Sequence, residues 1–465
     1  MVIRNTSELL SHGNLSARKN ILDIVDHALR VMDSYGIVRE LVHLKGHILT
    51  VGSLHYDLTR IPRIYVVGAG KGVSRIAEAL ESILGDKIER GIVVEKRGQK
   101  RPLRKVEVVE AGHPVPDEDS VRGAVEITKI ADLAKQGDLV FVCVAGGCSA
   151  LMTLPAKGLT LEDIRVVTRL LLACGADIQE INAVRKRVSD VMGGKLALHI
   201  HPAKMVNLIV IDEVLDLPWG PTVPDTTTSA DAIRVLRKYD LWYRISEPMR
   251  EYLERASPTQ ETPKVQDFER MGIKSQNVVL SDIKAACLAA REKAEELGLR
   301  SLVLSTSVEG ESRDVGFVLA SIAREIEKYG RPIEPPCAII AGGETTVTIL
   351  GRSGEGGRNQ ELALAASLKI DGSTSIALAA IGTDGTDGPT DMAGGIVDGH
   401  TVRRAVEAGI DLTENLKVHN SSHVLKQLGD AIVTGPTGTN VMDLLVIVVE
   451  REEILCELDS LGESN

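Results

Sequence analysis

Short apolar runs alternate with amphipathic stretches along most of this chain. This alternation is typical of α/β folds, in which mostly parallel strands are covered by helices. It predicts ligand binding beyond the carboxyl ends of the strands. We expect strands at residues 64–67, 91–94, 139–144, 207–211, 302–305, 338–341, 376–381 and 444–449. Helices are expected at 73–84, 161–175, 181–198, 282–297 and 312–328.

The length of 465 residues exceeds what one ordinary core supports, so we expect two domains. A polar, proline-containing stretch at 246–276 interrupts the alternation of strands and helices. We expect this stretch to connect an N-terminal domain at 1–245 to a C-terminal α/β domain at 277–465. The opening helical region, 17–49, is compatible with either domain.

The chain has 54 basic and 65 acidic residues, a net charge of −11 with neutral histidines. This balance argues against nucleic acid as a general partner, although a local basic pocket can still hold a phosphorylated ligand. No apolar run approaches the roughly 18 residues of a membrane helix. The N-terminus lacks the apolar core of a signal peptide, so we expect a cytoplasmic protein. The six cysteines have no CxxC spacing, which indicates buried reduced thiols and argues against disulfides or a zinc site.

The first glycine loop, GAGKG, follows an expected strand and precedes an expected helix. Gly68 and Gly70 allow a phosphate to approach backbone N–H groups at a helix N-terminus, with Lys71 as a cation beside it. The loop matches neither standard nucleotide fingerprint. Val73 takes the third glycine position of GxGxxG, and Tyr65 takes the first glycine position of a P-loop. A tight strand–helix turn with a solvated lysine is the structural alternative.

A second loop, AGGCSAL, also follows an apolar strand and opens toward a helix. The amides of Gly146 and Gly147 and the hydroxyl of Ser149 are candidate donors to an anion. A serine or cysteine nucleophile is less consistent with the sequence, since no histidine base stands in a recognisable motif with it. The next expected helix carries polar side chains near one face that form either a solvated surface or a site for an acidic ligand. These are Asn182, Arg185 and Lys186.

Further glycine-rich runs lie in the second half of the chain. GGETT follows an apolar strand, and GGRNQE places Arg358 just inside a helix start, where it can grip phosphate or carboxylate. In GTDGTDGPTD, three aspartates share one tight turn, so their repulsion requires a cation, an amide nest or hydroxyl donors. Gly385 and Gly388 supply the backbone freedom for that turn. Plain turn formation is the structural alternative there and in the hydroxyl-rich run TGPTGTN.

Together these runs resemble, in order and over nearly the whole chain, the class II glycerate kinase family. Its members are ATP-dependent glycerate 2-kinases with a C-terminal MOFRL domain. Each run alone is weakly specific, whereas their combination is highly specific. The matching runs are GAGKG (68–72), EAGHPVPDE (110–118), AGGCSAL (145–151), GADIQEINAVRK (175–186), GGKLA (193–197), GPTVPD (220–225), GGETT (342–346), GGRNQELAL (356–364), GTDGTDGPTDMAGG (382–395) and TGPTGTN (434–440).

The resemblance implies a Rossmann-like N-terminal domain and a smaller C-terminal α/β domain, with its MOFRL region at about 335–450 and the active site in the cleft between the domains. It implies transfer of the γ-phosphoryl group of ATP to the 2-hydroxyl of D-glycerate, which gives 2-phospho-D-glycerate and ADP. Phosphoryl transfer depends mainly on positioning and charge neutralisation, and the lysine, arginine, carboxylate and glycine residues of these runs suit that demand.

By carry-over from the family's motifs, Lys71 and Arg358 are the positive pair at the moving phosphoryl group, and either is alternatively a clamp for the glycerate carboxylate. Asp212 is the third expected catalytic residue, although the sequence leaves open which carboxylate is base and which is ligand. Mg²⁺ is expected on Glu344 and Asp384. The expected ATP-binding residues are Gly68, Gly70, Gly146, Gly147, Ser149, Asn182, Gly342, Gly343, Glu344, Thr345 and Gly357. The expected substrate-binding residues are Arg185, Asn359, Asp384, Asp387 and Asn440. ATP, Mg²⁺ and D-glycerate are the expected partners, and a homodimer is an open alternative to a monomer.

Three departures from the family pattern affect presumed nucleotide and substrate loops. The loop at 211–222 is shorter and gains Trp219, Cys148 replaces a glycine, and Met442 replaces an asparagine. The reaction class is therefore better supported than the acceptor, for which a related hydroxy acid or sugar acid is an alternative.

An NAD(P)-dependent hydroxypyruvate reductase is the rival enzyme class. Gly68 and Gly70 end the first expected strand, and Glu95 ends the second, near where a ribose-binding carboxylate is expected. Val73 breaks that fingerprint, and a dehydrogenase has no need of the aspartate loop or the GGRNQE helix start. A phosphometabolite-binding protein on the same fold is the non-enzymatic alternative.

Overall fold

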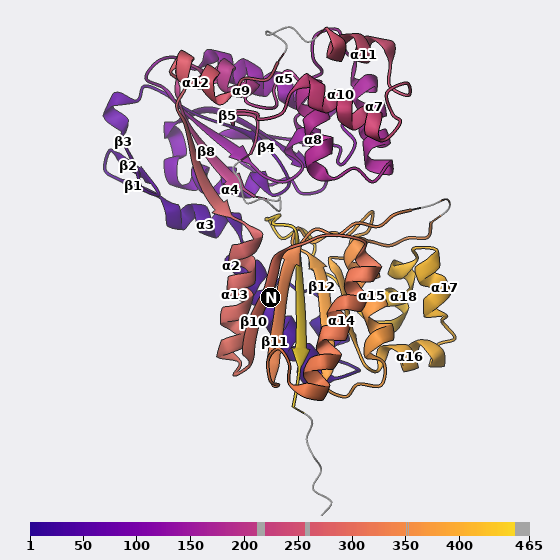
Figure 1. The fold of residues 1–465 in the computed structure, drawn as a ribbon. Coiled ribbons are helices and arrows are strands. Elements are labelled where there is room, and N and C mark those ends of the chain that lie inside the picture. Colours follow the sequence, from indigo (N-terminus) through magenta and orange to yellow (C-terminus); the bar gives the residue numbers. More distant parts are fainter. Residues whose placement is uncertain (212–218, 256–260, 350, 352, 452–465) are drawn as a thin grey trace, which may run out of the picture. The chain divides into compact units, whose positions relative to one another are not determined.

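The computed structural model describes residues 1–211, 219–255, 261–349, 351 and 353–451 (Figure 1). The chain forms two compact units. The N-terminal unit comprises Leu29–Ala286 and Pro436–Met442, and the C-terminal unit comprises Met1–Ala28, Cys287–Gly435 and the chain from Asp443 onward. The chain passes from one unit to the other within α2 (Leu15–Val31) and α13 (Ile283–Glu296), and again near residues 436 and 443.

This division differs from the expected domain boundaries at the N-terminus. We placed residues 1–245 in the N-terminal domain, but Met1–Ala28 belongs to the C-terminal unit. A buried ion-pair cluster explains the difference. Arg18 is fully enclosed and donates to the carboxylates of Asp398 and Asp430 in that unit, to the second at 2.8 Å.

A six-stranded parallel sheet forms the centre of the N-terminal unit, in the order β6-β5-β4-β7-β8-β9 (Figure 1). Numbered within this sheet, the order is 3-2-1-4-5-6, that of the doubly wound dinucleotide-binding fold. The expected Rossmann-like architecture is confirmed. Its inner strands are rich in buried aliphatic residues, as in parallel sheets covered on both faces. The strands are β4 (Ile64–Ala69), β5 (Ile88–Lys96), β6 (Val106–Ala111), β7 (Leu139–Val144), β8 (Lys204–Val210) and β9 (Ser275–Ser281).

Helices α4 (Val73–Leu84) and α5 (Glu118–Leu133) pack against this sheet. A separate aliphatic core joins α7 (Leu161–Ala173), α8 (Ile178–Arg187), α10 (Ser229–Lys238) and α11 (Glu247–Glu254). The remaining elements of this unit are α3 (Ser34–Leu41), α6 (Cys148–Leu151), α9 (Lys195–Ile200), α12 (Val265–Met271) and a small antiparallel sheet of β1 (Val42–Lys45), β2 (Ile48–Val51) and β3 (Leu54–Asp57).

Three local expectations change in this unit. The last part of the helical region expected at 17–49 forms strand β1 and the start of β2. The single helix expected at 181–198 is divided into α8 and α9, because Gly193 and Gly194 adopt left-handed conformations that interrupt a helix. The segment at 246–276, expected to connect two domains, lies inside the N-terminal unit, where its described part includes α11 and α12.

The C-terminal unit is built on a mixed sheet in the order β10-β11-β15-β12-β13-β14 (Figure 1). We expected mostly parallel strands, but β10 and β11 run parallel while the other neighbouring pairs are antiparallel. The reason is that β15 lies between β11 and β12 and runs opposite to both. The strands are β10 (Arg300–Val308), β11 (Cys337–Gly343), β12 (Ile376–Gly382), β13 (Gly394–Asp398), β14 (Ala431–Ile432) and β15 (Asp443–Val449).

Helices α14 (Ser312–Tyr329) and α15 (Arg358–Ile370) pack closely on each other in this unit. Residues of both contribute to the main core with the sheet strands. The shorter helices are α1 (Thr6–Leu9), α16 (Thr401–Glu407), α17 (Leu412–Lys417) and α18 (Ser421–Leu428).

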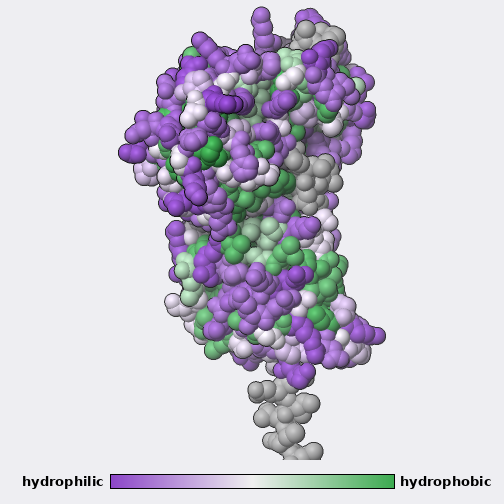
Figure 2. All heavy atoms as spheres, turned by 90° about the vertical axis from the view of Figure 1, so that its left-hand side faces the viewer, coloured by the Kyte–Doolittle hydropathy of each residue, from purple (hydrophilic) through white to green (hydrophobic). Residues whose placement is uncertain are grey.

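The surface view in Figure 2 is dominated by hydrophilic side chains, with smaller hydrophobic areas among them. Within the described ranges, no helix is both long and apolar enough to cross a membrane. Cys143 and Cys337, as predicted, are buried free thiols within strands.

Candidate active site

The first two glycine loops meet at one edge of the N-terminal sheet. GAGKG follows β4 and AGGCSAL follows β7, and these strands are parallel neighbours where the strand order changes direction. The amide of Lys71 donates to the carbonyl of Gly146 at 2.8 Å. A Cβ at Gly68 would lie 2.0 Å from the Cys143 carbonyl, and one at Gly70 would lie 2.4 Å from that of Ala145. The structure thus brings the expected glycines together and shows why only glycine fits there.

The N-terminus of α4 is filled by the carboxylate of Glu95. This fully buried side chain accepts from the amide of Gly72 at 2.9 Å, from that of Ser74 at 3.0 Å and from that of Lys96 at 3.0 Å. The Ser74 hydroxyl donates to it at 2.8 Å. Burial raises the pKa of Glu95 to about 7, although these hydrogen bonds act in the opposite direction.

Other amides of the GAGKG loop also have protein acceptors. The amide of Gly70 donates to Val94, and that of Lys71 to Gly146. The helix start that we expected to bind a phosphate therefore already holds a carboxyl group supplied by the chain. ATP-binding roles for Gly68 and Gly70 stay predictions. ATP would have to contact this loop through groups other than the amides of Gly70 and Lys71.

Near the second loop, Arg185 of α8 reaches Ser149 of α6. Its Nη1 donates to the Ser149 hydroxyl at 3.3 Å, and the two residues line one small pocket. Gly147 has a φ of +79°, and a Cβ there would lie 2.7 Å from the ring of His113. His113 comes from the EAGHPVPDE run, from which we had selected no site residue.

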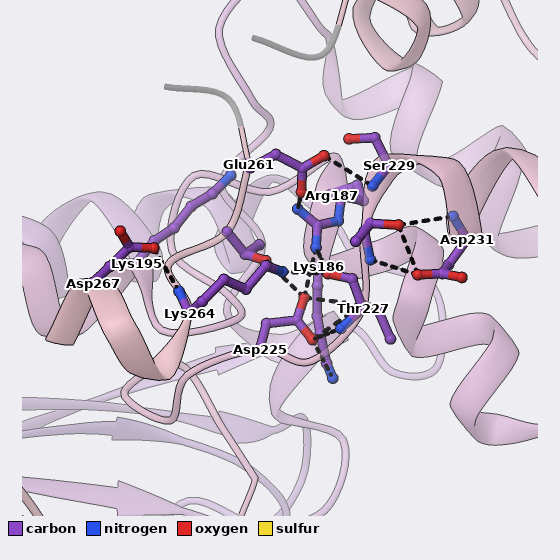
Figure 3. A network of polar contacts seen from close by, with 12 residues as sticks. Lys186, Arg187, Lys195, Asp225, Thr227, Ser229, Asp231, Glu261, Lys264 and Asp267 are labelled. Carbon is purple, nitrogen blue, oxygen red and sulfur yellow. Dashed lines mark hydrogen bonds and ion pairs between the residues drawn. The ribbon is translucent and has the colours of Figure 1, made fainter. Parts of the chain in front are cut away.

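The three consecutive basic residues of α8 have different surroundings, and Figure 3 shows those of Lys186 and Arg187. Lys186 donates to the buried carboxylate of Asp225 at 3.3 Å, and Arg187 donates to the same carboxylate at 3.0 Å and also pairs with Glu261. The charges of Lys186 and Arg187 are thus balanced by carboxylates of the chain. Asn182 and Arg185 share this helix, so the predicted grouping on α8 is retained for those two residues.

In the C-terminal unit, strand register brings three loops to one sheet edge. Asp443, the first residue of β15, pairs with Gly343 of β11 on one side and with Gly382 of β12 on the other. Glu344 and Thr345 therefore follow one neighbour, and Asp384 follows the other. Asp443 was absent from our expected site, although it stands just after the TGPTGTN run, where the predicted strand begins.

Arg358 connects these strand ends to α15. Its guanidinium donates to both oxygens of Asp443, at 2.6 and 3.0 Å, and to Glu344 at 2.5 Å. Burial lowers the pKa of Arg358, but the carboxylates of Asp443 and Glu344 outweigh burial and hold it above the ordinary value. Burial raises the pKa of Asp443, against the attraction of Arg358.

Asp387 fills the N-terminus of α15 as Glu95 fills that of α4. Its carboxylate accepts from the amides of Asn359 at 3.2 Å and Gln360 at 2.9 Å. A Cβ at Gly357 would lie 2.2 Å from that carboxylate, which explains the glycine before the helix. Burial, helped by the charge of Asp443, raises the pKa of Asp387 to about 6.

The aspartate loop is held by its own hydroxyls and by a neighbouring loop. Asp384 accepts from the amide and the hydroxyl of Thr386, at 2.9 and 3.0 Å. Gly385 has a φ of +86°, and a Cβ there would lie 2.0 Å from the carbonyl of Gly435. Among the described side chains, no cluster of three or more histidine, cysteine or acidic groups is arranged to hold a metal.

Three further expected site residues have the following positions. Asn440 is buried and belongs to the N-terminal unit, unlike the neighbouring Thr434. Gly342 lies in β11 beside the Glu344 loop. Asp212 lies outside the described residues.

Two family descriptions match this chain. Residues 20–254 match a "Domain of unknown function (DUF4147)", and residues 337–443 match the "MOFRL family". The second match confirms the expected MOFRL region in the C-terminal part of the chain.

Similarity to individual proteins extends over nearly the whole length. A "Glycerate 2-kinase" of Pyrococcus horikoshii is 42% identical over 434 residues, covering 92% of this chain and 96% of the relative. A "Putative hydroxypyruvate reductase" of Agrobacterium vitis is 38% identical, covering 83% of this chain and 87% of the relative. The crystal structure of a glycerate kinase from Thermotoga maritima is 37% identical with a TM-score of 0.77, covering 93% of this chain and 99% of that one. The chain belongs to the glycerate kinase family whose members have a C-terminal MOFRL domain.

Proposed function

We propose that this protein is an ATP-dependent glycerate 2-kinase. It transfers the γ-phosphoryl group of ATP to the 2-hydroxyl of D-glycerate and releases 2-phospho-D-glycerate and ADP. The observation that carries this conclusion is the 42% identity to a glycerate 2-kinase over nearly the full length of both chains.

Two cations are proposed to stabilise the moving phosphoryl group. Lys71 follows β4 in the GAGKG loop, and Arg358 begins α15. Charge neutralisation by fixed cations is the main demand of phosphoryl transfer. The paired contacts of Arg358 with Asp443 and Glu344 hold its guanidinium in one orientation, so that little reorganisation is needed during the reaction. Asp212 remains our proposed third catalytic residue.

We propose that the ligands contact residues in and near the glycine-rich loops that follow the strands. For ATP these are Gly68, Gly70, Gly146, Gly147, Ser149 and Asn182 in the N-terminal unit, and Gly342, Gly343, Glu344, Thr345 and Gly357 in the C-terminal unit. For the acceptor they are Arg185, Asn359, Asp384, Asp387 and Asn440. Glu95 and Asp387 occupy two helix N-termini, so the backbone amides there are not open to phosphate. Side-chain cations are therefore proposed to contribute more to phosphate binding here than in a standard P-loop.

Mg²⁺ is proposed to accompany ATP. Carboxylate oxygens are suitable donors, and Mg²⁺ often uses only one or two of them together with water and substrate phosphates. Glu344 and Asp384 are the carboxylates proposed for this role, and they follow the neighbouring strands β11 and β12. When bound there, the ion would offset charge on the phosphates.

Hydroxypyruvate reduction is the second candidate, because a putative reductase of that name is 38% identical. In a standard Rossmann site the dinucleotide pyrophosphate binds at the N-terminus of the first helix. Here Glu95 receives the amides of Gly72 and Ser74 at that position. A second anion there would face a buried carboxylate, so the structure favours the kinase.

We further propose that the reaction takes place in the cytosol, where ATP is available. A homodimer stays a prediction that gel filtration with light scattering can test.

The direct test is a coupled assay of ADP release with ATP, Mg²⁺ and D-glycerate, run beside NADH oxidation with hydroxypyruvate. We expect ADP release that depends on glycerate, and no NADH oxidation above background. ADP release with another hydroxy acid but not glycerate would retain the kinase and replace its substrate. NADH oxidation without ADP release would establish the reductase.

A further inference from the structure

We propose that the pocket around Arg185 binds the carboxylate of the acceptor acid and thereby selects short hydroxy acids. This inference rests on the proposed kinase function and adds the identity of the group that anchors the acceptor. The pocket lies between α6, α7 and α8, beside Pro116.

Arg185 is a cation without a counter-ion in the described part of the chain. Its Nη2 is buried and has no hydrogen-bond partner there, and its Nη1 donates to the neutral hydroxyl of Ser149. Burial accordingly lowers the pKa of Arg185 to about 10. Arg185 is half-buried, and a buried guanidinium nitrogen without a partner is unfavourable, so such a group is expected where a ligand supplies the opposite charge.

The neighbouring residues on the same helix show that acids are available nearby. Lys186 and Arg187 both pair with Asp225, and Arg187 pairs also with Glu261 (Figure 3). The fold therefore compensates the next two basic residues and leaves Arg185 facing the pocket. This contrast points to a ligand and not to an incomplete structural ion pair.

The pocket matches a carboxylate better than a nucleotide phosphate. Arg185 is the sole charged residue among the lining side chains described, so the site offers one positive charge. Ser149 and Thr168 line the pocket with hydroxyl groups, and Ile164 and Val188 add aliphatic surface. A guanidinium binds a planar carboxylate through two parallel hydrogen bonds, and one charge balances the other. A triphosphate carries several negative charges and would need more cations.

The pocket is small and open to solvent. Its empty space of about 280 Å³ includes open solvent at the mouth, so the enclosed part leaves little room beyond the group that contacts Arg185. This limited room favours a short acid over a bulky one. Glycerol, which lacks the carboxylate, should be a poor acceptor.

The test compares Arg185→Met with Arg187→Met and with Arg169→Met, in which an exposed arginine of α7 is removed. We expect Arg185→Met to raise KM for D-glycerate by at least about 30-fold and to leave KM for ATP within about threefold. Its Tm should be unchanged or higher, because a half-buried charge without a counter-ion among the described residues is lost. Arg187→Met should lower Tm by several degrees, because Asp225 and Glu261 lose their partner, and Arg169→Met should change neither quantity.

The possible outcomes distinguish a failure of the Arg185 proposal from a failure of the proposed kinase function. Wild-type turnover of glycerate with an unchanged KM in Arg185→Met, or with a raised KM for ATP alone, would overturn the pocket and leave the kinase intact. If the wild type does not turn over glycerate, the proposed function fails, and calorimetric titration of D-glycerate decides the pocket. Binding by the wild type that is lost in Arg185→Met would support it, whereas binding retained by the variant or absent from both proteins would overturn it.

Discussion

In both units a buried carboxylate binds the first backbone amides of a helix, but the two units differ in the charged groups around their arginines. In each unit a glycine-rich segment leads into a helix whose first amides bind a buried carboxylate, Glu95 at α4 and Asp387 at α15. Among the described residues of the N-terminal unit, Arg185 is a cation without a counter-ion. In the C-terminal unit, Arg358 is surrounded by Glu344 and Asp443, with Asp387 contributing to its surroundings.

This difference shows that a glycine loop before a helix does not by itself mark a phosphate site. The amides are the functional part of such a loop, and here carboxylates of the chain already bind them. It also assigns different chemistry to the two regions. An unpaired cation is suited to an anionic substrate, whereas a surplus of carboxylates around one arginine is suited to cationic partners such as Mg²⁺.

The largest effects should come from removing the two proposed catalytic cations. Lys71→Ala and Arg358→Ala should each lower kcat by about 10³-fold, because both charges act mainly on the transition state. Arg358→Ala also leaves Glu344 and Asp443 without a partner, so Arg358→Lys serves as a second variant that keeps the charge. Steady-state kinetics with circular dichroism as a folding control will measure this. Turnover like that of the wild type in Lys71→Ala, or in a folded Arg358→Ala, would remove that residue from the mechanism.

Removing divalent metal tests the carboxylate-rich region. We expect activity to fall at least a hundredfold after exhaustive EDTA treatment and to return with Mg²⁺, because triphosphate without a counter-ion is a poor phosphoryl donor. Glu344→Gln should raise the Mg²⁺ concentration that gives half-maximal rate. Full activity in EDTA would contradict the metal requirement for the whole reaction.

Most of the fold could be predicted from apolar patterning. All eight expected strands are present, because continuous aliphatic runs flanked by turns are the mark of buried strands. The small sheet at 42–57 and the strands at 106–111, 275–281, 394–398 and 431–432 were not predicted. Those at 106–111 and 275–281 mix polar with apolar residues, and that at 394–398 opens with two glycines. The strand directions in the C-terminal sheet could not be predicted from the sequence either, because β15 lies between two strands that are far from it along the chain.

For the candidate site, sequence motifs predicted which loops meet but not how their polar groups are used. Glu95 was considered as a ribose ligand, and Asp387 as a substrate ligand, yet both bind helix amides. Such pairing depends on tertiary contacts between segments distant in sequence, as does the ion pair of Arg358 with Asp443, 85 residues away. That Arg185 has no counter-ion among the described residues is likewise visible only once its neighbours in space are known.

The two helix caps can be compared by Glu95→Gln and Asp387→Asn. Each change places an amide group against amide donors, so we expect a loss of about 1–3 kcal/mol in the free energy of unfolding. The loss should be larger for Glu95, whose carboxylate accepts from three backbone amides and a hydroxyl. Urea denaturation at constant pH measures both. Equal stability of wild type and Glu95→Gln would show that this cap is dispensable.

The pH dependence of the Glu95 variant has a definite sign. Burial raises the pKa of Glu95 to about 7 from an ordinary 4.5, so the folded protein holds a proton that the unfolded chain releases. Stability is therefore lost as pH rises between these values, and the advantage of wild type over Glu95→Gln should shrink by up to about 3 kcal/mol from about pH 5 to about pH 8. An advantage that grows with pH would show that the hydrogen bonds outweigh burial.

The smallest expected effect concerns the filled N-terminus of α4. NADH and NADPH should shift Tm by less than about 1 °C, whereas MgATP should raise it by about 5 °C or more at concentrations far above Kd. Thermal denaturation with each ligand provides the comparison. Marked stabilisation by NADH would mean that Glu95 yields its amides to a pyrophosphate.

Phosphorus NMR of the reaction product tests the central claim most directly. The protein is incubated with ATP, Mg²⁺ and D-glycerate, and the coupling of the new phosphate to carbon-bound protons identifies the esterified oxygen. The proposed reaction predicts 2-phospho-D-glycerate, with the phosphate coupled to the single proton at C2. A product phosphorylated at the 3-oxygen, coupled to two protons, would contradict the proposed regiochemistry, and the absence of any glycerate-dependent phosphate ester would contradict the proposed function.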